Sequence, residues 1–451
     1  MGAFGHEGSK VGRVLVIYYS CSVVCGVGTW VESLSQELAL RGWDVTVGLA
    51  WGRHFHDPRR IEACRPALKT CWMDGRTGTE EGRIQAIERT LRRLRPDVVI
   101  LTCLDSAFEA VRRLRYGGTK VRLMATNHGN FAHQAASLLE QVDVVDLAVC
   151  VGRLSFEAMS SGAGAFPPER IRHLPNAVPL PFRAREAHDL PFRVGYAGRL
   201  DDEARKRASD LGPFFGALAR LSTTAELWIA GDGPQEDALR AMAAPYSGRV
   251  RCFGRLTRTQ LYQDFYPCLD VLVSFSSSEG WGLSIAEAMA HGVVPVSSAF
   301  SGIHLEGLVR EGANGLVFPV GEPARAAELV AALFCDPVRL NRLARQAAVD
   351  IQEKYSPARF GEAWSRALTD CLALPELPPS PRPASLSRRS RCGLRESQWE
   401  RIRRLLRRRV PHASAGEEWP HYRCRDAALT ERLAREMAAI ESRRASSNPS
   451  A

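Results

Sequence analysis

Two glutamates eight positions apart, with a glycine-rich turn between them, are the residues of this chain best suited to bind a ligand. Residues 276–287 read Ser-Ser-Ser-Glu-Gly-Trp-Gly-Leu-Ser-Ile-Ala-Glu, so Glu279 lies in a turn and Glu287 lies inside the helix expected to follow. Gly280 and Gly282 leave backbone N–H groups open to a close ligand. The N-terminal end of a helix carries partial positive charge, which suits a pyrophosphate or sugar hydroxyl groups. The two carboxylates can then contact different parts of one elongated ligand.

A purely structural interpretation of Glu287 also exists. Ser284 and Glu287 have the spacing of a capping box, in which the glutamate side chain accepts a hydrogen bond from the backbone N–H of the serine. That interpretation leaves Glu279 and the two glycines of the turn unexplained. We therefore favour a ligand site over a helix cap.

Alternating apolar runs and helical segments must position these residues. Strands are expected at residues 14–17, 45–49, 98–102, 121–125 and 147–151, and after a proline-rich hinge at 194–197, 226–230, 250–253, 271–275 and 294–297. Helices are expected between them, for example at 30–41, 81–95, 211–221, 235–242, 258–266, 284–291, 324–333 and 355–372. Continuous apolar strands that alternate with helices predict a parallel sheet covered on both faces. The fold class is therefore α/β, with two doubly wound domains and a ligand cleft between them.

The length of 451 residues also predicts two domains, because a chain this long exceeds the usual size of a domain with a single hydrophobic core. We place an N-terminal Rossmann-like domain at residues 11–185 and a C-terminal one at 186–354, followed by a helix at 355–372. Residues 373–393 form a Pro/Ser/Arg linker with too little apolar content to pack, and residues 394–451 form a basic helical tail. The N-terminus shows no apolar stretch before a cleavage site, so we expect a cytoplasmic protein.

The motif around Glu279 and Glu287 resembles that of a glycosyltransferase of the GT-B fold, family 4 type, whose signature is two glutamates separated by seven residues. The likeness covers about residues 14–372 and leaves the tail out. It implies that Glu287 holds the ribose hydroxyls of a nucleotide and that Glu279 contacts a hydroxyl of the donor sugar. It also implies that the intervening backbone faces the sugar and the phosphates, and these residues are Gly280, Trp281, Gly282 and Leu283.

A second family element is Gly-Arg followed shortly by Lys, which corresponds here to Gly198, Arg199 and Lys206. Two cations near a pyrophosphate neutralise the charge of the leaving group without a metal ion. The stretch between the cations is longer than is usual in the family, so Arg205 and Arg207 are alternatives to Lys206. The competing interpretation of this stretch is a solvated charged loop.

Two glycine turns and one histidine complete the resemblance. Gly231 and Gly233 match a Gly-x-Gly turn near the nucleotide, although such a turn is also ordinary punctuation between a strand and a helix. Gly26 and Gly28 match the glycine loop of the first domain, which approaches the donor phosphates. His128 follows a strand, where family members often have an active-site histidine.

The resemblance implies a retaining hexosyltransferase that takes sugar from a UDP- or GDP-sugar and transfers it to a sugar, lipid-linked or small-molecule acceptor. No Asp-x-Asp cluster stands out, so we expect neither a metal ion nor another cofactor. A sugar-nucleotide epimerase of the GT-B fold and a non-enzymatic binding protein remain alternatives. An NAD-dependent oxidoreductase would need a third glycine after Gly26 and Gly28, and the chain lacks it.

Residues 381–451 carry nearly all of the net charge, because they hold 17 arginines against eight acidic residues while the whole chain has +10. Within them, Trp399, Ile402, Leu405 and Leu406 form an apolar stripe among arginines. This pattern indicates attachment to an anionic membrane surface, peripheral on the inner membrane face, and also fits a membrane-associated binding protein. The alternative is a helix packed on the body with solvated arginines. We expect no nucleic-acid partner, since no recognition module accompanies the charge.

Overall fold

The computed structural model describes residues 11–18, 26–52, 57–102, 104–162, 164–178, 191–202, 205–246, 248–379, 381–390, 393–410 and 424–447. The chain divides into two compact units. Unit 1 comprises Met1–Val151, Ser155–Pro175 and Ala358–Met437, and unit 2 comprises Gly152–Leu154, Asn176–Pro357 and Ala438–Ala451. The domain boundary expected between residues 185 and 186 lies outside the described residues.

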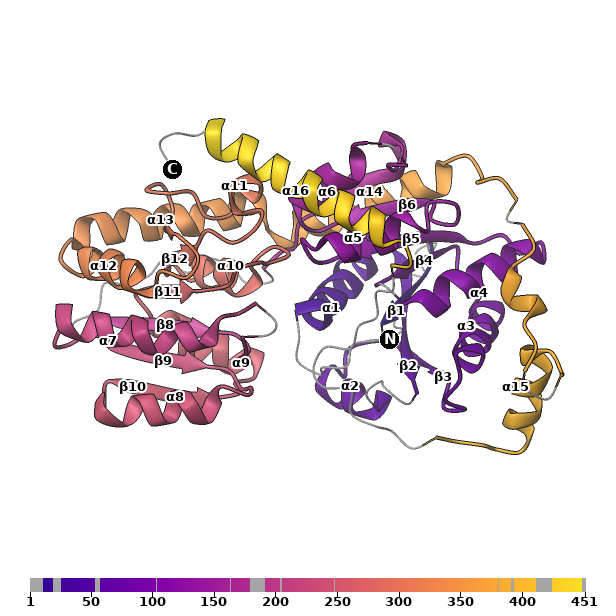
Figure 1. Ribbon diagram of the computed structural model, residues 1–451, viewed down its shortest axis with the longest axis horizontal. Coiled ribbons are helices and arrows are strands. Elements are labelled where there is room, and N and C mark those ends of the chain that lie inside the picture. The colour runs from indigo at the N-terminus through magenta and orange to yellow at the C-terminus, as the bar shows by residue number, and fades with distance from the viewer. Residues whose placement is uncertain are drawn as a thin grey trace, which may run out of the picture. The chain divides into compact units, whose positions relative to one another are not determined.

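Unit 1 is built on a seven-stranded sheet whose order is β3-β2-β1-β4-β5-β6-β7, with every neighbouring pair parallel (Figure 1). Its strands are β1 Gly12–Tyr18, β2 Trp43–Trp51, β3 Thr70–Asp74, β4 Val98–Leu101, β5 Arg122–Asn127, β6 Leu147–Cys150 and β7 Ile171–His173. Its helices include α1 Gly26–Ala39, α2 Pro58–Cys64, α3 Glu80–Leu94, α4 Asp105–Tyr116, α5 Ala132–Leu139 and α6 Arg153–Ser160. The central strand β4 is buried at every position, as a parallel strand covered on both faces must be.

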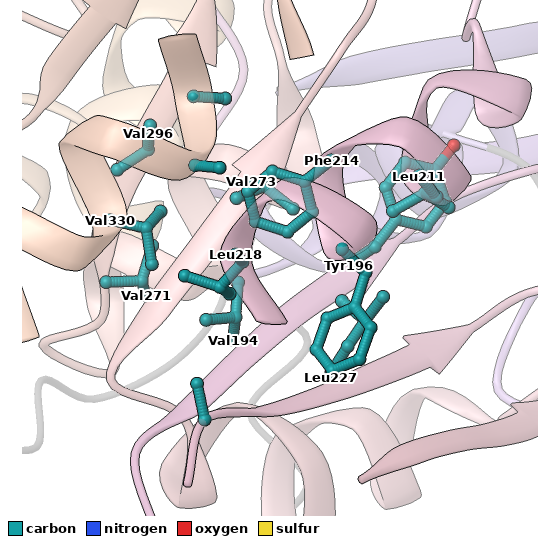
Figure 2. Close-up of a cluster of buried hydrophobic side chains, with 14 of the residues drawn as sticks. Val194, Tyr196, Leu211, Phe214, Leu218, Leu227, Val271, Val273, Val296 and Val330 are labelled. Carbon is teal, nitrogen blue, oxygen red and sulfur yellow. The ribbon is translucent and has the colours of Figure 1, made fainter. Parts of the chain in front are cut away.

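Unit 2 is built on a six-stranded parallel sheet of order β10-β9-β8-β11-β12-β13. Its strands are β8 Arg193–Ala197, β9 Glu226–Ala230, β10 Val250–Gly254, β11 Val271–Ser274, β12 Val294–Ser298 and β13 Leu316–Phe318. Its helices include α7 Leu211–Leu221, α8 Glu236–Ala243, α9 Arg258–Gln260, α10 Leu283–Ala290, α11 Ile303–Glu306, α12 Pro323–Phe334 and α13 Pro337–Lys354. Figure 2 shows side chains of α7 and α12, such as Phe214 and Val330, packed with strand residues such as Val273. The expected two α/β Rossmann-like domains are thus confirmed.

Every strand expected from the sequence is present, and three further strands complete the sheets. These are β3, β7 and β13, and each lies at the edge of its sheet. Edge strands are often short and partly polar, which weakens their signal in the sequence. The helix expected at residues 258–266 is wrong in type, because only Arg258–Gln260 is α-helical and a π-helical turn follows at Leu261–Phe265.

The C-terminal region packs on unit 1. Helix α14 (Pro357–Ala373) buries Trp364, whose ring lies 5.4 Å from that of Trp30. The segment at residues 373–393 was expected not to pack, yet Pro383 and Ser385 are buried. This segment packs through a polar contact, because the Ser385 hydroxyl accepts a hydrogen bond at 3.0 Å from the buried guanidinium of Arg113. The helices α15 (Glu396–Leu405) and α16 (Ala427–Ser447) follow.

Candidate active site

The turn between the two glutamates depends on Gly282. This residue is the N-cap of α10 and has a φ of +90°, a conformation that residues with a side chain rarely adopt. No side chain caps α10, so the capping-box interpretation of Ser284 and Glu287 is wrong. Because the helix starts at Leu283, the backbone of Gly280–Leu283 forms its N-terminal end, where N–H groups lack partners within the helix.

The carboxylate of Glu287 is buried in unit 2 and bound by two tyrosines. Oε1 accepts a hydrogen bond from the Tyr262 hydroxyl at 2.5 Å, and Oε2 accepts one from the Tyr266 hydroxyl at 2.9 Å. Burial raises the pKa of Glu287, while both hydroxyl groups oppose this rise because they stabilise the charged form. Each carboxylate oxygen keeps a further lone pair, so Glu287 can also accept hydrogen bonds from a ligand diol.

Sequence reasoning did not select Tyr262 and Tyr266. They lie on the irregular segment that begins with the π-helical turn, and such turns occur frequently at functional sites. The guanidinium of Arg258 lies 5.3 Å from the centroid of the Tyr262 ring. The sequence shows two tyrosines four positions apart, which would share one face of the expected helix, and buried hydroxyls require partners. Neither fact identifies Glu287 as that partner.

Glu279 is bound by a residue far away in the sequence. Its Oε1 lies 2.6 Å from Lys206 Nζ and accepts a hydrogen bond of 2.6 Å from the Ser276 hydroxyl. The side chains of Lys206 and Glu279 both keep some exposure to solvent, at 23% and 15%. The structure therefore brings together the carboxylate and the cation that the sequence selected, whereas Arg207 pairs with Asp210 at 2.8 Å.

Arg199, the other cation selected from the sequence, has a different partner from Lys206. Its guanidinium Nε is 3.5 Å from Asp201 Oδ2, and its backbone carbonyl accepts a hydrogen bond from the Tyr196 hydroxyl at 2.9 Å. Burial, followed by the negative charges of Glu279 and Asp201, raises the pKa of Tyr196. Tyr196 therefore remains a hydrogen-bond donor next to both charged groups.

The two glycine elements of unit 2 interlock through their backbones. The N–H of Gly198 donates to the carbonyl of Ala230 at 3.0 Å, and the N–H of Leu200 donates to the carbonyl of Asp232 at 2.9 Å. A Cβ atom added to Gly231 would lie 1.8 Å from the carbonyl oxygen of Gly198. A Cβ atom on Gly233 would lie 2.5 Å from the carbonyl oxygen of Leu200. These glycines are explained by the close approach of two backbone segments, and not merely by the need for a turn between a strand and a helix.

The remaining selected residues belong to unit 1. Gly26 begins α1, and a Cβ atom on Gly28 would lie 2.7 Å from Arg65 Nη2. His128 follows β5, with Nε2 3.0 Å from the Thr126 hydroxyl and its ring centroid 4.6 Å from that of Trp30. Burial lowers the pKa of His128 from 6.5 to about 4. Its imidazole is therefore neutral near pH 7.

In the part of the chain that the structure describes, no group of three or more His, Cys, Asp or Glu side chains is placed to hold a metal ion. Within the same residues, no helix combines the length and the apolar character needed to cross a bilayer.

Comparisons with protein families match both units. The model described as "Glycosyltransferase Family 4" matches residues 24–181, and the model "Glycosyl transferases group 1" matches residues 191–336. The chain belongs to the family 4 type of glycosyltransferase. Among solved structures, this glycosyltransferase is similar to Anabaena Alr3699/HepE in complex with UDP and glucose, with a TM-score of 0.63 and 14% identity over 79% of this chain and 99% of that one. A likeness at this identity shows the fold, which is GT-B.

Curated relatives of this glycosyltransferase match over part of their length. The lipopolysaccharide core biosynthesis glycosyltransferase LpsE of Rhizobium meliloti is 31% identical over 154 residues, which are 34% of this chain and 44% of the relative. The lipopolysaccharide 1,6-galactosyltransferase of Salmonella typhimurium is 27% identical over 242 residues, which are 51% of this chain and 64% of the relative. The matches thus span less than two thirds of either relative.

Proposed function

We propose that this protein is a retaining glycosyltransferase that moves a hexose from a UDP- or GDP-sugar to a sugar or lipid-linked acceptor. The observation that carries the proposal is the contact of Lys206 with Glu279 in the same unit that buries Glu287 against two hydroxyl donors. The named activities of relatives, transfer in lipopolysaccharide synthesis, support a saccharide or lipid-linked acceptor. The UDP in the similar Anabaena structure supports a nucleotide-sugar donor.

Glu287 and Glu279 would divide the donor between them. A nucleoside has a ribose diol, and the free lone pairs of the Glu287 carboxylate can accept both of its hydroxyl protons. Glu279 would accept a hydrogen bond from a hydroxyl of the sugar. The N-terminal end of α10, at Gly280, Trp281, Gly282 and Leu283, would offer its N–H groups to the diphosphate that joins the two halves.

Fixed positive charge would stabilise the departing diphosphate. Arg199 and Lys206 are held by Asp201 and Glu279, and cations held in place before the reaction need little reorganisation as negative charge develops. We therefore propose a reaction that does not require a metal ion. The backbone turns at Gly198, Gly231 and Gly233 would shape the donor-binding part of unit 2. In unit 1, Gly26, Gly28 and the neutral His128 are the residues that we propose to contact substrate. Retention follows if the acceptor attacks on the face from which the diphosphate leaves.

We also propose that the protein works in the cytoplasm, peripheral on the inner membrane face. The support is the concentration of positive charge in residues 381–451, since anionic lipids attract basic segments.

Two conservative variants test the donor site. Glu287→Gln should weaken binding of UDP or GDP about tenfold, because one charged acceptor is lost. Glu279→Gln should leave nucleotide binding within about twofold but lower kcat with a sugar nucleotide about 100-fold, because its contact is made to the sugar. Calorimetry with free nucleotides and a panel of sugar nucleotides gives both quantities, and NMR of the product gives its anomeric configuration.

Glu353→Gln is the matched control, since Glu353 is an exposed glutamate on α13. It should behave as the unchanged protein. Full activity in both Glu279→Gln and Glu287→Gln would refute the site, and a product of inverted configuration would refute retention.

A further inference from the structure

Helix α15 lies along α3 in unit 1 and is held there by polar contacts (Figure 1). Three hydrogen bonds join the two segments, from Thr79 Oγ1 to Glu400 Oε2 at 2.6 Å, from Gln85 Nε2 to the Ser397 carbonyl at 3.1 Å and from Arg403 Nη2 to the Thr77 carbonyl at 2.9 Å. Glu400 is buried among them. One side of the basic tail is therefore docked on the body in a defined orientation.

The chain beyond α15 is held as well. The backbone N–H of Val410 donates to the Arg76 carbonyl at 2.8 Å, and a Cβ atom on Gly78 would lie within 2.4 Å of the Val410 side chain. The segment between Arg403 and Val410 is thus anchored at both ends. Its outward side chains keep a fixed place on unit 1.

Two adjacent leucines lie on the outward side of this segment. Leu405 is 79% exposed and Leu406 is 67% exposed, so the apolar stripe expected from the sequence faces solvent at this end. Residues 401–410 contain six arginines and no acidic residue. Five of these arginines are exposed, and together with the two leucines they form a surface that we call the α15 surface: Arg401, Arg404, Leu405, Leu406, Arg407, Arg408 and Arg409.

We propose that the α15 surface docks onto an anionic lipid bilayer, an inference that rests on the peripheral membrane location proposed above. Guanidinium groups bind lipid phosphates through paired hydrogen bonds, and two leucines between them can enter the boundary between headgroups and acyl chains. The arginines thus match the negative charge of the headgroups, and the exposed leucines match the apolar region beneath them. A nucleic acid would match the charge alone, because proteins that bind single strands offer aromatic side chains to the bases, not leucines.

The α15 surface stands apart from the proposed reaction. It lies outside the residues matched by both family models. The contacts that hold α15 come from α3 and the turn before it, and none of the residues that we assign to donor binding takes part in them. Membrane docking can therefore fail in an experiment while nucleotide binding is retained, and the reverse also holds.

Sedimentation of the full chain with lipid vesicles tests the proposal. The vesicles are phosphatidylcholine alone or with about 30% phosphatidylglycerol, at about 0.1 M and about 0.5 M NaCl. The test variants are Leu405→Ser/Leu406→Ser and Arg407→Gln/Arg408→Gln/Arg409→Gln. The protein should bind the anionic vesicles at low salt, and each variant should weaken this binding about tenfold or more. Pure phosphatidylcholine and high salt should weaken it similarly.

Matched controls keep the result specific. Leu40→Ser/Val338→Ser removes two apolar side chains of similar exposure, 79% and 81%, that stand elsewhere. Arg220→Gln/Arg345→Gln/Arg359→Gln removes the same charge from other exposed positions. Both controls should bind vesicles within about twofold of the unchanged protein, and UDP binding should be equal in all four variants. Equal vesicle binding by the α15 variants and the controls would overturn the proposal, as would binding of a single-stranded RNA without binding of anionic vesicles.

Discussion

At the scale of single residues, the environment of Glu287 decides what this carboxylate can do. Burial alone would favour its neutral form, and a neutral carboxyl group is a weaker acceptor for a ribose diol. Tyr262 and Tyr266 each donate to one of its oxygens and so favour the charged form. The tyrosines are therefore positioning residues for the proposed nucleotide contact.

Tyr266→Phe should raise the pKa of Glu287, because one donor to the charged form is lost. An acid with a higher pKa is ionised only at higher pH. As the pH is lowered, UDP binding should therefore be lost at a higher pH in Tyr266→Phe than in the unchanged protein. At pH 7 the affinity should fall about three- to tenfold and should partly recover as the pH rises. Calorimetric titrations with UDP from pH 5.5 to 9 measure this.

Tyr246→Phe serves as the control for that variant, since Tyr246 packs its ring against Phe215 and has no contact with Glu287 among the described residues. Its pH profile should match that of the unchanged protein. If the profile of Tyr266→Phe matched it too, the hydroxyl of Tyr266 would have no influence on the ionisation of Glu287.

At the scale of elements, unit 2 positions its site through backbone contact between two turns. The turn at Gly198 follows β8, and the turn at Gly231 and Gly233 follows β9, the neighbouring strand. Parallel strands bring their carboxyl ends to one edge of the sheet, so these turns meet there. Because no side chain separates them, a small change in one turn is transmitted directly to Arg199.

Gly231→Ala should therefore disturb both stability and nucleotide binding. Its Cβ atom would lie 1.8 Å from a backbone oxygen, which can move only if the turn moves. We expect a loss of about 3 kcal/mol in the free energy of unfolding and weaker UDP binding. Thermal unfolding with and without UDP measures both effects.

Gly248→Ala separates steric contact from backbone conformation. Gly248 also has a positive φ, +81°, but a Cβ atom there would meet no atom within 4 Å. This variant should cost about 1 kcal/mol and leave UDP binding unchanged. Equal losses in the two variants would show that backbone contact between the turns is unimportant.

At the scale of the whole molecule, the C-terminal region is part of the core of unit 1. The guanidinium of Arg113 is buried and donates to Glu81 at 2.8 and 2.7 Å, while Glu88 lies 3.6 Å away. Ser385 of the C-terminal region contacts both Arg113 and Glu109. Buried charges need partners of opposite charge and hydrogen-bond donors or acceptors around them. The region therefore covers a polar cluster that would otherwise face solvent.

Arg113→Leu should destabilise unit 1 by about 3–5 kcal/mol, because it leaves buried carboxylates without their cation. Ser385→Ala should cost only about 1 kcal/mol, the typical value of one hydrogen bond. Arg112→Leu removes a neighbouring arginine that pairs with the half-exposed Asp143, and it should cost less than about 1 kcal/mol. Thermal unfolding of the three variants gives this order, and a loss in Arg112→Leu as large as that in Arg113→Leu would contradict it.

The sequence alone determined the two α/β units, the glycine turns and the pair of glutamates. These features are local, because apolar periodicity and short motifs depend only on residues that are close together in the sequence. Residues that act through distant partners could not be found this way. Lys206 stood among three adjacent cations, and only folding showed which of them meets Glu279, 73 positions later in the chain.

Tertiary structure alone decided the partners of Glu287, the edge strands and the place of the basic tail. Tyr262 and Tyr266 lie on a segment whose π-helical turn no propensity predicts. The tail is docked by hydrogen bonds between residues about 300 positions apart, such as Gln85 and Ser397. Polar contacts of this kind leave no periodic pattern in the sequence, because they depend on geometry that exists only after the chain has folded.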